Sequence, residues 1–255
     1  MNVLKKIIDD KKNEIPKQLS KTNLSKTNKD VSALLKKNNQ RHHKLNLIAE
    51  LKRVSPSLGV LNSAMTVETA IKMYEPYASA LSILTEKNYF GGSLDDLKNA
   101  SLLTDLPLLR KDFITETIQV TEARLFGADF YLLIVAALDR NQLSELIEAG
   151  KEFNMPALIE VHNQEELETA LEFNVEILGI NNRNLIDLSI DLHTTSQLSQ
   201  IIPEKRREKL VLISESGLKT SQNLQEVEGI VDGVLMGTAF MENANPQNLL
   251  KTLFG

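Results

Sequence analysis

The sequence predicts an α/β protein in which a (β/α)8 barrel follows a helical extension. Two observations predict it: strand-like apolar runs alternate with helix-like stretches from Leu45 onward, and there are eight such strand–helix units. The alternation is typical of a parallel sheet with helices outside it, and eight units at this length favour closure into a barrel. An open doubly wound sheet is the alternative, but residues 55–59, after the first strand, lack the glycine fingerprint of that fold.

The first predicted strand covers residues 46–51, where Leu47, Ile48 and Ala49 are apolar in succession, as expected when both faces of a strand are covered. The other predicted strands cover residues 80–84, 107–110, 130–135, 157–160, 177–180, 210–214 and 232–236. Helical periodicity follows them at residues 67–74, 94–103, 117–126, 141–153, 165–173, 193–201, 221–227 and 247–254. Gly127 and Gly233 precede strands, where a helix leads into a strand through a turn.

Residues 1–44 are predicted to form the helical extension and residues 45–255 the barrel, as one domain overall. Val3, Leu4, Ile7 and Ile8 share one helical face, and Pro16 marks the end of this helix. A second short helix is predicted over residues 31–37. We expect the extension to cover the active site in part.

The extension is strongly basic. It carries 12 Lys and Arg against 4 Asp and Glu, a net charge of +8, so the rest of the chain carries −13 of the total of −5. Such a segment is compatible with binding to nucleic acid, an anionic surface or an anionic substrate, or with a solvated helix. Because it lacks an aromatic residue for base stacking, we expect no nucleic-acid partner.

Composition excludes several classes of site. The chain has no cysteine, which rules out disulfides, thiolate metal sites and cysteine nucleophiles, and its four histidines show no metal-ligand spacing, so we expect no metal. The apolar run at residues 130–138 is too short to span a bilayer, and the N-terminus lacks the apolar core of a signal peptide. We therefore expect a cytoplasmic location and no membrane partner.

Polar residues follow most of the predicted strands. In a barrel, the active site lies at the C-terminal ends of the strands. Glu50 and Lys52 leave the first strand on one face, and Lys111 and Phe113 share a face after the third, because strand side chains alternate. Other strand ends contribute Glu160, then Asn181, Asn182 and Arg183, then Ser214, Glu215, Ser216 and Gly217, and finally Gly237 and Thr238.

Each of these residues also has a structural interpretation. Glu50 and Lys52 are compatible with a surface ion pair, and Lys111 with a pair to Asp112 or Glu116. An Asx turn would account for the two asparagines, and helix caps for the serine and threonine that follow the last two strands. Because six of the eight strands end in polar groups that are able to face inward, we interpret the set as an active site.

The strand ends also predict what kind of substrate binds. Loops after the seventh and eighth strands of a barrel often bind phosphate, and small residues there let backbone N–H groups approach an anion. Residues 216–217 and 237–238 occupy these places, with Ser55 as a further hydroxyl donor. Phe90, Phe113 and Leu132 would suit an apolar or aromatic part of the substrate. Two lysines and three carboxylates between these ends are suited to acid–base catalysis.

Eight motifs resemble those of the indole-3-glycerol-phosphate synthase family, in the family's order over residues 45–242. They are IAELKRVSPSLG at 48–59, ILTEKNYFGGSLDDL at 83–97, PLLRKDFI at 107–114, GADFYLLIVAAL at 127–138, LIEVHNQEEL at 158–167, LGINNRNL at 178–185, SESGL at 214–218 and GVLMGTAFM at 233–241. The resemblance implies a carboxy-lyase of tryptophan biosynthesis that uses no cofactor. Its substrate would be 1-(2-carboxyphenylamino)-1-deoxyribulose 5-phosphate and its product indole-3-glycerol phosphate. Leu58 departs from the family, which often has lysine there.

The resemblance also implies residue roles. Lys111 would be the general acid, Glu160 the general base and Lys52 the partner of the substrate carboxylate. The remaining implied positions are Glu50 and Asn181, which would orient the lysines and sugar hydroxyls; Glu215, Ser216 and Arg183 in the active site; Ser55, Gly217, Gly237 and Thr238 around the phosphate; and Pro56, Phe90, Phe113 and Leu132 around the aromatic ring.

Three other functions stay open from the sequence. A phosphoribosylanthranilate isomerase is disfavoured because its usual base is a cysteine, which the chain lacks. A Schiff-base aldolase would use Lys111 as its nucleophile. A non-catalytic barrel would keep only phosphate binding. We expect a monomer that takes a small phosphorylated substrate.

Overall fold

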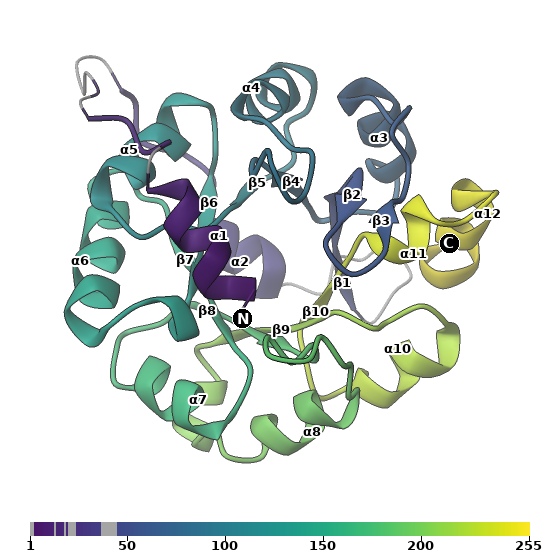
Figure 1. Cartoon of the computed structure of the whole chain (residues 1–255). Coiled ribbons are helices and arrows are strands. Elements are labelled where there is room, and N and C mark those ends of the chain that lie inside the picture. The colour runs from purple at the N-terminus through teal and green to yellow at the C-terminus, as the bar shows by residue number, and fades with distance from the viewer. Residues whose placement is uncertain (1–2, 13, 18, 20–23, 37–44) are drawn as a thin grey trace.

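Eight parallel strands form a closed barrel in the computed structural model, which describes residues 3–12, 14–17, 19, 24–36 and 45–255 (Figure 1). Each strand is paired in parallel with its neighbours, and β1 pairs with both β4 and β10 to close the ring. The strands are β1 (Asn46–Leu51), β4 (Ala80–Leu84), β5 (Leu108–Lys111), β6 (Phe130–Ile134), β7 (Ala157–Val161), β8 (Ile177–Asn181), β9 (Val211–Glu215) and β10 (Gly233–Met236). The predicted barrel is confirmed, and the open-sheet alternative is wrong.

Helices surround the barrel at the predicted places. They are α3 (Val67–Tyr74), α4 (Leu94–Leu103), α5 (Thr117–Leu125), α6 (Arg140–Lys151), α7 (Gln164–Leu171), α8 (His193–Ser199), α10 (Ser221–Val227) and α12 (Pro246–Phe254). Short polar side chains cap the N-termini of several of them; Ser93 and Asp139, for example, accept hydrogen bonds from the backbone N–H groups of Asp96 and Gln142. The predicted bounds of these eight helices agree with the structure to within two residues.

Three kinds of short element were not predicted. They are a hairpin of β2 (Val54–Ser55) and β3 (Gly59–Val60), a 3-10 helix η1 (Val135–Ala137), and the one-turn helices α9 (Glu204–Arg207) and α11 (Thr238–Met241). Segments of two to four residues are too short to show a hydrophobic period. The predicted strand over 130–135 ends at Ile134 because Val135 begins η1.

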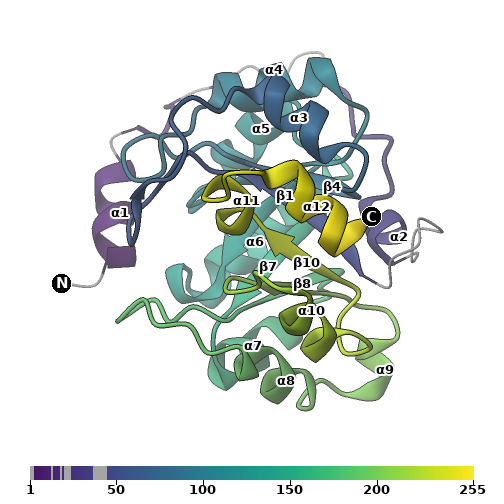
Figure 2. The ribbon, with the colours of Figure 1, turned by 90° about the vertical axis from the view of Figure 1, so that its right-hand side faces the viewer.

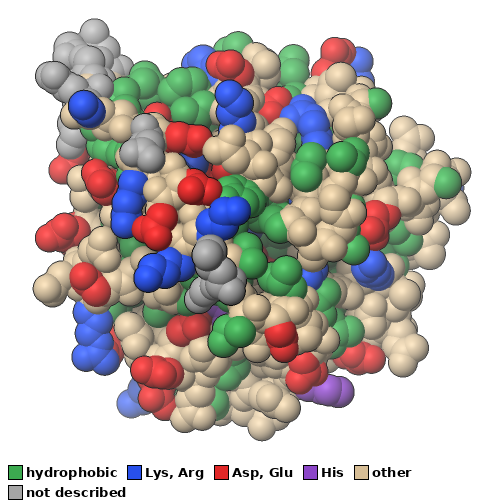
Figure 3. Space-filling view, viewed as in Figure 1, with side chains coloured by type: hydrophobic (Ala, Val, Ile, Leu, Met, Phe, Trp, Pro, Cys, Tyr) green, Lys and Arg blue, Asp and Glu red, His purple; other side chains and the backbone are tan. Residues whose placement is uncertain are grey.

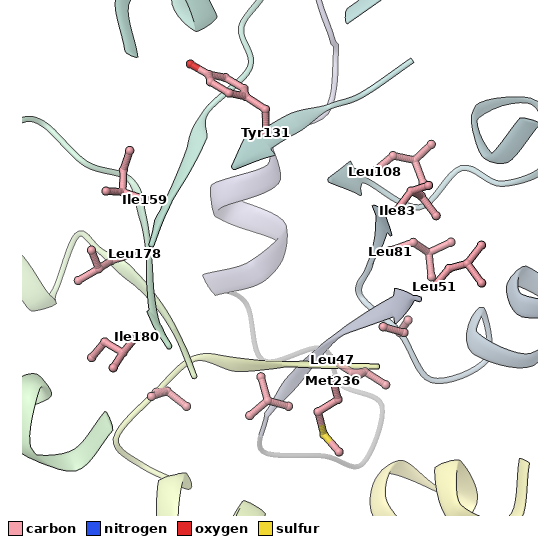
Figure 4. Close-up of a cluster of buried hydrophobic side chains, with 14 of the residues drawn as sticks. Leu47, Leu51, Leu81, Ile83, Leu108, Tyr131, Ile159, Leu178, Ile180 and Met236 are labelled. Carbon is pink, nitrogen blue, oxygen red and sulfur yellow. The ribbon is translucent and has the colours of Figure 1, made fainter. Parts of the chain in front are cut away.

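Side chains of successive strand residues point alternately to the helices and to the barrel axis. Figure 4 shows the outward set, including Leu47, Leu51 and Leu81, which packs against the helices. Ile48 belongs to a separate cluster that fills the interior. Because the side-chain period of a strand is two, Glu50 and Lys52 follow Ile48 onto the axis side, at the C-terminal end of the barrel.

Two helices of the extension lie at opposite ends of the barrel. Helix α1 (Val3–Lys11) crosses the C-terminal mouth, and α2 (Val31–Lys36) lies against the other end (Figures 1 and 2). Val31 and Leu35 of α2 pack into the interior cluster beside Ile48. Both predicted helices of the extension are thus present. Residue 37, the predicted end of the second helix, belongs to the segment 37–44, which lies outside the described residues.

Among the described residues, no helix is both long enough and apolar enough to cross a membrane.

Candidate active site

A cavity of about 450 Å³ opens at the C-terminal end of the barrel. Its walls include every residue to which the family resemblance assigned a role: Glu50, Lys52, Ser55, Pro56, Phe90, Lys111, Phe113, Leu132, Glu160, Asn181, Arg183, Glu215, Ser216, Gly217, Gly237 and Thr238. Asn182 and Ser214, also named at the strand ends, are buried and do not line the cavity. A cavity of this size suits a small organic molecule. The structure therefore brings the predicted residues together, and their individual roles remain predictions.

Lys111 lines the cavity and lies between two carboxylates. Its Nζ donates hydrogen bonds of 2.7 Å to Glu160 Oε2 and 2.7 Å to Glu215 Oε2. Both glutamates are at most 3% exposed. The alternative in which Lys111 pairs with Asp112 or Glu116 is wrong, because its ion pairs are with Glu160 and Glu215, and Asp112 pairs with Lys11 and Arg110.

Burial and these contacts separate the protonation states of the three groups. Burial lowers the pKa of Lys111, but Glu160 and Glu215 outweigh this effect and raise the pKa above its usual value. Burial raises the pKa of Glu215 to about 7. Burial also raises the pKa of Glu160, but Lys111 and His162 outweigh this effect and hold the pKa of that carboxyl well below its usual range. One carboxyl is thus an anion near neutral pH, while the other holds a proton for part of the time, which is how sites assign base and acid roles.

Glu50 and Lys52 form an ion pair with 2.8 Å between Lys52 Nζ and Glu50 Oε1. Because both side chains line the cavity and are largely buried, the surface-pair interpretation is wrong, although they are indeed paired. Lys52 lines the cavity, and its ammonium is held by Glu50.

The asparagine pair combines a turn with a buried network. Asn181 Oδ1 accepts a hydrogen bond of 3.0 Å from the N–H of Arg183, as in an Asx turn, and both residues also line the cavity. Asn182 is buried, and its Nδ2 donates a hydrogen bond of 3.0 Å to the carbonyl oxygen of Ser216. The Asx interpretation is therefore confirmed for Asn181, and Asn182 supports the turn at residue 216.

The two loops predicted for phosphate lie side by side, because β9 and β10 are neighbours. Ser216 and Gly217 both have positive φ angles, 67° and 84°, a conformation that favours glycine. A Cβ on Gly237 would lie 2.8 Å from Glu50 Cβ, so this strand end approaches β1 as closely as a glycine allows. Thr238 is the first residue of α11, whose N-cap is Gly237 without a side-chain hydrogen bond, and α10 is capped by Thr220, so the interpretation of Ser216 and Thr238 as helix caps is wrong.

The opposite side of the cavity is apolar. The rings of Phe90 and Phe113 are 6.1 Å apart between centroids, and Leu132 lies in the same wall. Helix α1 completes this side with Val3, Leu4 and Ile7, so the expected partial cover by the extension is present. The sequence showed the apolar face of this helix but not what it contacts.

Helix α1 is held at the mouth by polar contacts. Lys11 Nζ lies 2.5 Å from Asp112 Oδ1, and both side chains are buried. Tyr89 donates a hydrogen bond to Asp10, and the ammonium of Lys6 lies 5.8 Å from the centre of the Tyr89 ring. Figure 3 shows basic and acidic side chains interspersed on the face that α1 crosses.

His162 was missed in the sequence, where histidines were considered only as metal ligands. Its Nδ1 lies 2.9 Å from Glu166 Oε2 and its Nε2 lies 3.2 Å from Glu160 Oε1. Burial lowers its pKa, but the two carboxylates outweigh this effect and raise the pKa to about 9. The signal was available, because His162 is two residues from Glu160 and so shares its face. No group of three or more His, Asp or Glu within the described ranges is arranged to hold a metal ion.

Comparisons with known proteins agree on one family. Residues 4–253 match the family model for indole-3-glycerol phosphate synthase. Proteins named indole-3-glycerol phosphate synthase are 38% identical to this chain in Petrotoga mobilis (98% of this chain and 96% of that protein), 38% in Leptospira interrogans (99% and 97%) and 40% in Bacillus cereus (95% and 94%).

Solved structures with similar folds are more distant. A crystal structure of 3-hexulose-6-phosphate synthase from Salmonella typhimurium has a TM-score of 0.65 at 13% identity, over 82% of this chain and 96% of that one. One of 3-keto-L-gulonate-6-phosphate decarboxylase from Vibrio cholerae has a TM-score of 0.61 at 13% identity, over 83% and 96%. Such low identity supports the fold alone.

Proposed function

Because this chain belongs to the indole-3-glycerol phosphate synthase family, we propose that Lys111 is the general acid and Glu160 the general base of the family's reaction in this protein. The family makes the chain a decarboxylating carbon–carbon lyase of tryptophan biosynthesis. The reaction closes a ring: a carbon of the substrate's aromatic ring attacks the sugar ketone, carbon dioxide leaves, and water is lost. Each residue role below is part of the proposal.

The position of Lys111 between two glutamates is the observation that carries the proposal. The 2.7 Å contacts to Glu160 and Glu215 keep Lys111 as an ammonium, so a proton is present when the ring closes. As the ring carbon attacks, the ketone oxygen becomes a strongly basic oxyanion, which takes this proton. Glu160, an anion held at the same centre, then removes a proton during the loss of water.

The rest of the cavity would orient the substrate around this centre. We assign the substrate carboxylate to Lys52, whose ammonium Glu50 holds at 2.8 Å. The phosphate would bind at Ser55, Gly217, Gly237 and Thr238, and the aromatic ring between Phe90, Phe113 and Leu132, beneath α1. Asn181, Arg183, Ser216 and Pro56 would complete the wall. Fixed geometry of this kind contributes to the rate by aligning the reacting atoms.

Product fluorescence gives a direct test. The chain has no tryptophan, so indole emission from indole-3-glycerol phosphate rises against a dark background. We expect turnover by the wild-type protein, loss of at least about 10³-fold in kcat for Lys111→Ala and Glu160→Gln, and little change for Lys87→Ala, an exposed lysine used as a matched control.

Other outcomes would point to the other functions. Binding of substrate without turnover in the wild type would favour a non-catalytic barrel. Trapping of Lys111 by borohydride with a carbonyl substrate would favour an aldolase. Wild-type rates in Glu160→Gln would show that Glu160 is not the base. The small phosphorylated substrate follows from the family, while the monomeric state and cytoplasmic location stay predictions.

A further inference from the structure

We propose that His162 is a positioning residue, a cation that links Glu160 to Glu166 and keeps Glu160 ionised after Lys111 has given up its proton. The inference rests on the proposed function, in which Glu160 is the base. His162 follows β7 directly and shares the inward face of Glu160. Its side chain is 6% exposed.

The geometry gives each oxygen of Glu160 its own cation. Oε2 of Glu160 lies 2.7 Å from Lys111 Nζ, and Oε1 lies 3.2 Å from His162 Nε2. The contact between His162 and Glu160 is an ion pair without hydrogen-bond geometry. His162 Nε2 has no hydrogen-bond partner within the described structure.

Glu166 holds the other side of the imidazole. Its Oε2 lies 2.9 Å from His162 Nδ1 and accepts a further hydrogen bond of 2.8 Å from the His162 backbone N–H. Glu166 belongs to the first turn of α7, so the helix fixes where the ring stands. A carboxylate on one ring nitrogen also raises the basicity of the other.

Charge balance explains why a second cation is needed. When the Nζ–H bond of Lys111 breaks and the proton moves to the substrate oxygen, Lys111 becomes neutral and no longer holds Glu160 as an anion. Burial alone raises the pKa of Glu160. His162 keeps its proton and its charge, so Glu160 remains a carboxylate for the proton abstraction that follows.

The charged groups around His162 support this protonation state. Glu160 faces it from β7 and Glu166 from α7, while Lys111 of β5 and Glu215 of β9 act on it through Glu160. The two contacting carboxylates raise the pKa of His162 to about 9. The imidazole is therefore an imidazolium throughout the neutral pH range.

Three variants and two readouts test the proposal. His162→Gln keeps a polar side chain but no charge, His162→Lys restores a cation, and Glu166→Gln removes the anchoring carboxylate. For His162→Gln we expect the acidic limb of the kcat–pH profile to move up by about one unit, which lowers kcat about tenfold at pH values below that limb, with KM within about twofold. His162→Lys should return that limb towards its wild-type position. As a matched control, Asp139→Ala removes the N-terminal cap of α6 and should lower Tm while leaving the pH profile unchanged.

An NMR titration of the histidine side chains provides a readout that does not depend on turnover. The signal that disappears in His162→Gln should titrate above pH 8 in the wild type and move lower in Glu166→Gln. Titration near the ordinary value of about 6.5 would overturn the proposal, as would an unchanged kcat–pH profile in His162→Gln. A different result would contradict the proposed function itself, namely wild-type turnover in Glu160→Gln. Glu166→Gln keeps the test decisive should a variant at residue 162 fail to fold.

Discussion

Gly179 of β8 leaves the space that one oxygen of Glu215 occupies, and replacing it by alanine would displace the carboxylate beside Lys111. A Cβ at residue 179 would lie 2.0 Å from Glu215 Oε1, whereas ordinary contact begins at 3.4 Å, so the oxygen must move by 1.4 Å. Glu215 is 1% exposed, and the added Cβ would also lie 3.3 Å from Leu158 Cδ1. Lys111 donates its 2.7 Å hydrogen bond to the other oxygen of this carboxylate, Oε2, so we expect a shift of the carboxylate to lengthen that bond.

The expected effects on rate and stability differ in size. A misplacement of about 1 Å in an active site can lower the rate about 10²-fold, and we expect that loss in kcat. Overpacking typically costs about 1–3 kcal/mol, while replacing glycine by alanine returns about 0.4–1 kcal/mol through the unfolded chain. We therefore expect a net loss of about 1–2 kcal/mol in the free energy of unfolding for Gly179→Ala.

Indole fluorescence would measure kcat, and urea unfolding followed by circular dichroism would measure stability. Combining Gly179→Ala with Glu215→Ala completes a double-mutant cycle. If the clash is the cause, the alanine at residue 179 should have little further effect on stability once the Glu215 side chain is absent. A wild-type kcat in Gly179→Ala, or an equal loss of stability in both backgrounds, would refute the reasoning.

Four further predictions concern the mouth of the barrel and its anchoring. Lys11→Met removes one of the two basic partners of Asp112; because the arginine partner remains, we expect a loss of about 1–3 kcal/mol, measured by urea unfolding. Burial raises the pKa of Asp112, but its two basic partners outweigh this and lower it below 3.8. This lowered pKa adds stability above about pH 4 that is lost as pH falls through the folded value, and an acid titration of Asp112→Asn should lack that part. Ile7→Ser removes apolar wall from the cavity and should raise KM about tenfold in steady-state assays, with a smaller effect on kcat. Ser216→Gly relieves a φ of 67° and should raise the unfolding free energy by about 1 kcal/mol, while kcat falls through loss of the hydroxyl.

Local patterns were enough to predict most of the barrel. The run Leu47–Ile48–Ala49 identified a strand covered on both faces, and all eight barrel strands lie within one or two residues of their predicted positions. The elements that were missed are short, and two of them, α9 and α11, are single turns of helix. In elements this short, tertiary contacts decide the conformation, because one turn of helix gains too few hydrogen bonds to form alone.

The sequence by itself determined which residues meet at the mouth of the barrel. Strand side chains alternate with a period of two, and parallel strands present their C-terminal ends at one edge. Glu50 with Lys52, and Lys111 with Phe113, therefore had to face the same space. This reasoning needs only the strand positions, which the apolar runs supply.

Only the tertiary structure decided which of these residues touch. Lys111 hydrogen-bonds Glu160 and Glu215, which are 49 and 104 residues away in the chain, while its neighbour Asp112 pairs with Lys11 and Arg110. Helix α1 lies over the mouth because a buried lysine reaches Asp112, which is about a hundred residues away. Such distances depend on barrel closure and strand register, which arise from the packing of the whole chain, and no local period in the sequence carries that information.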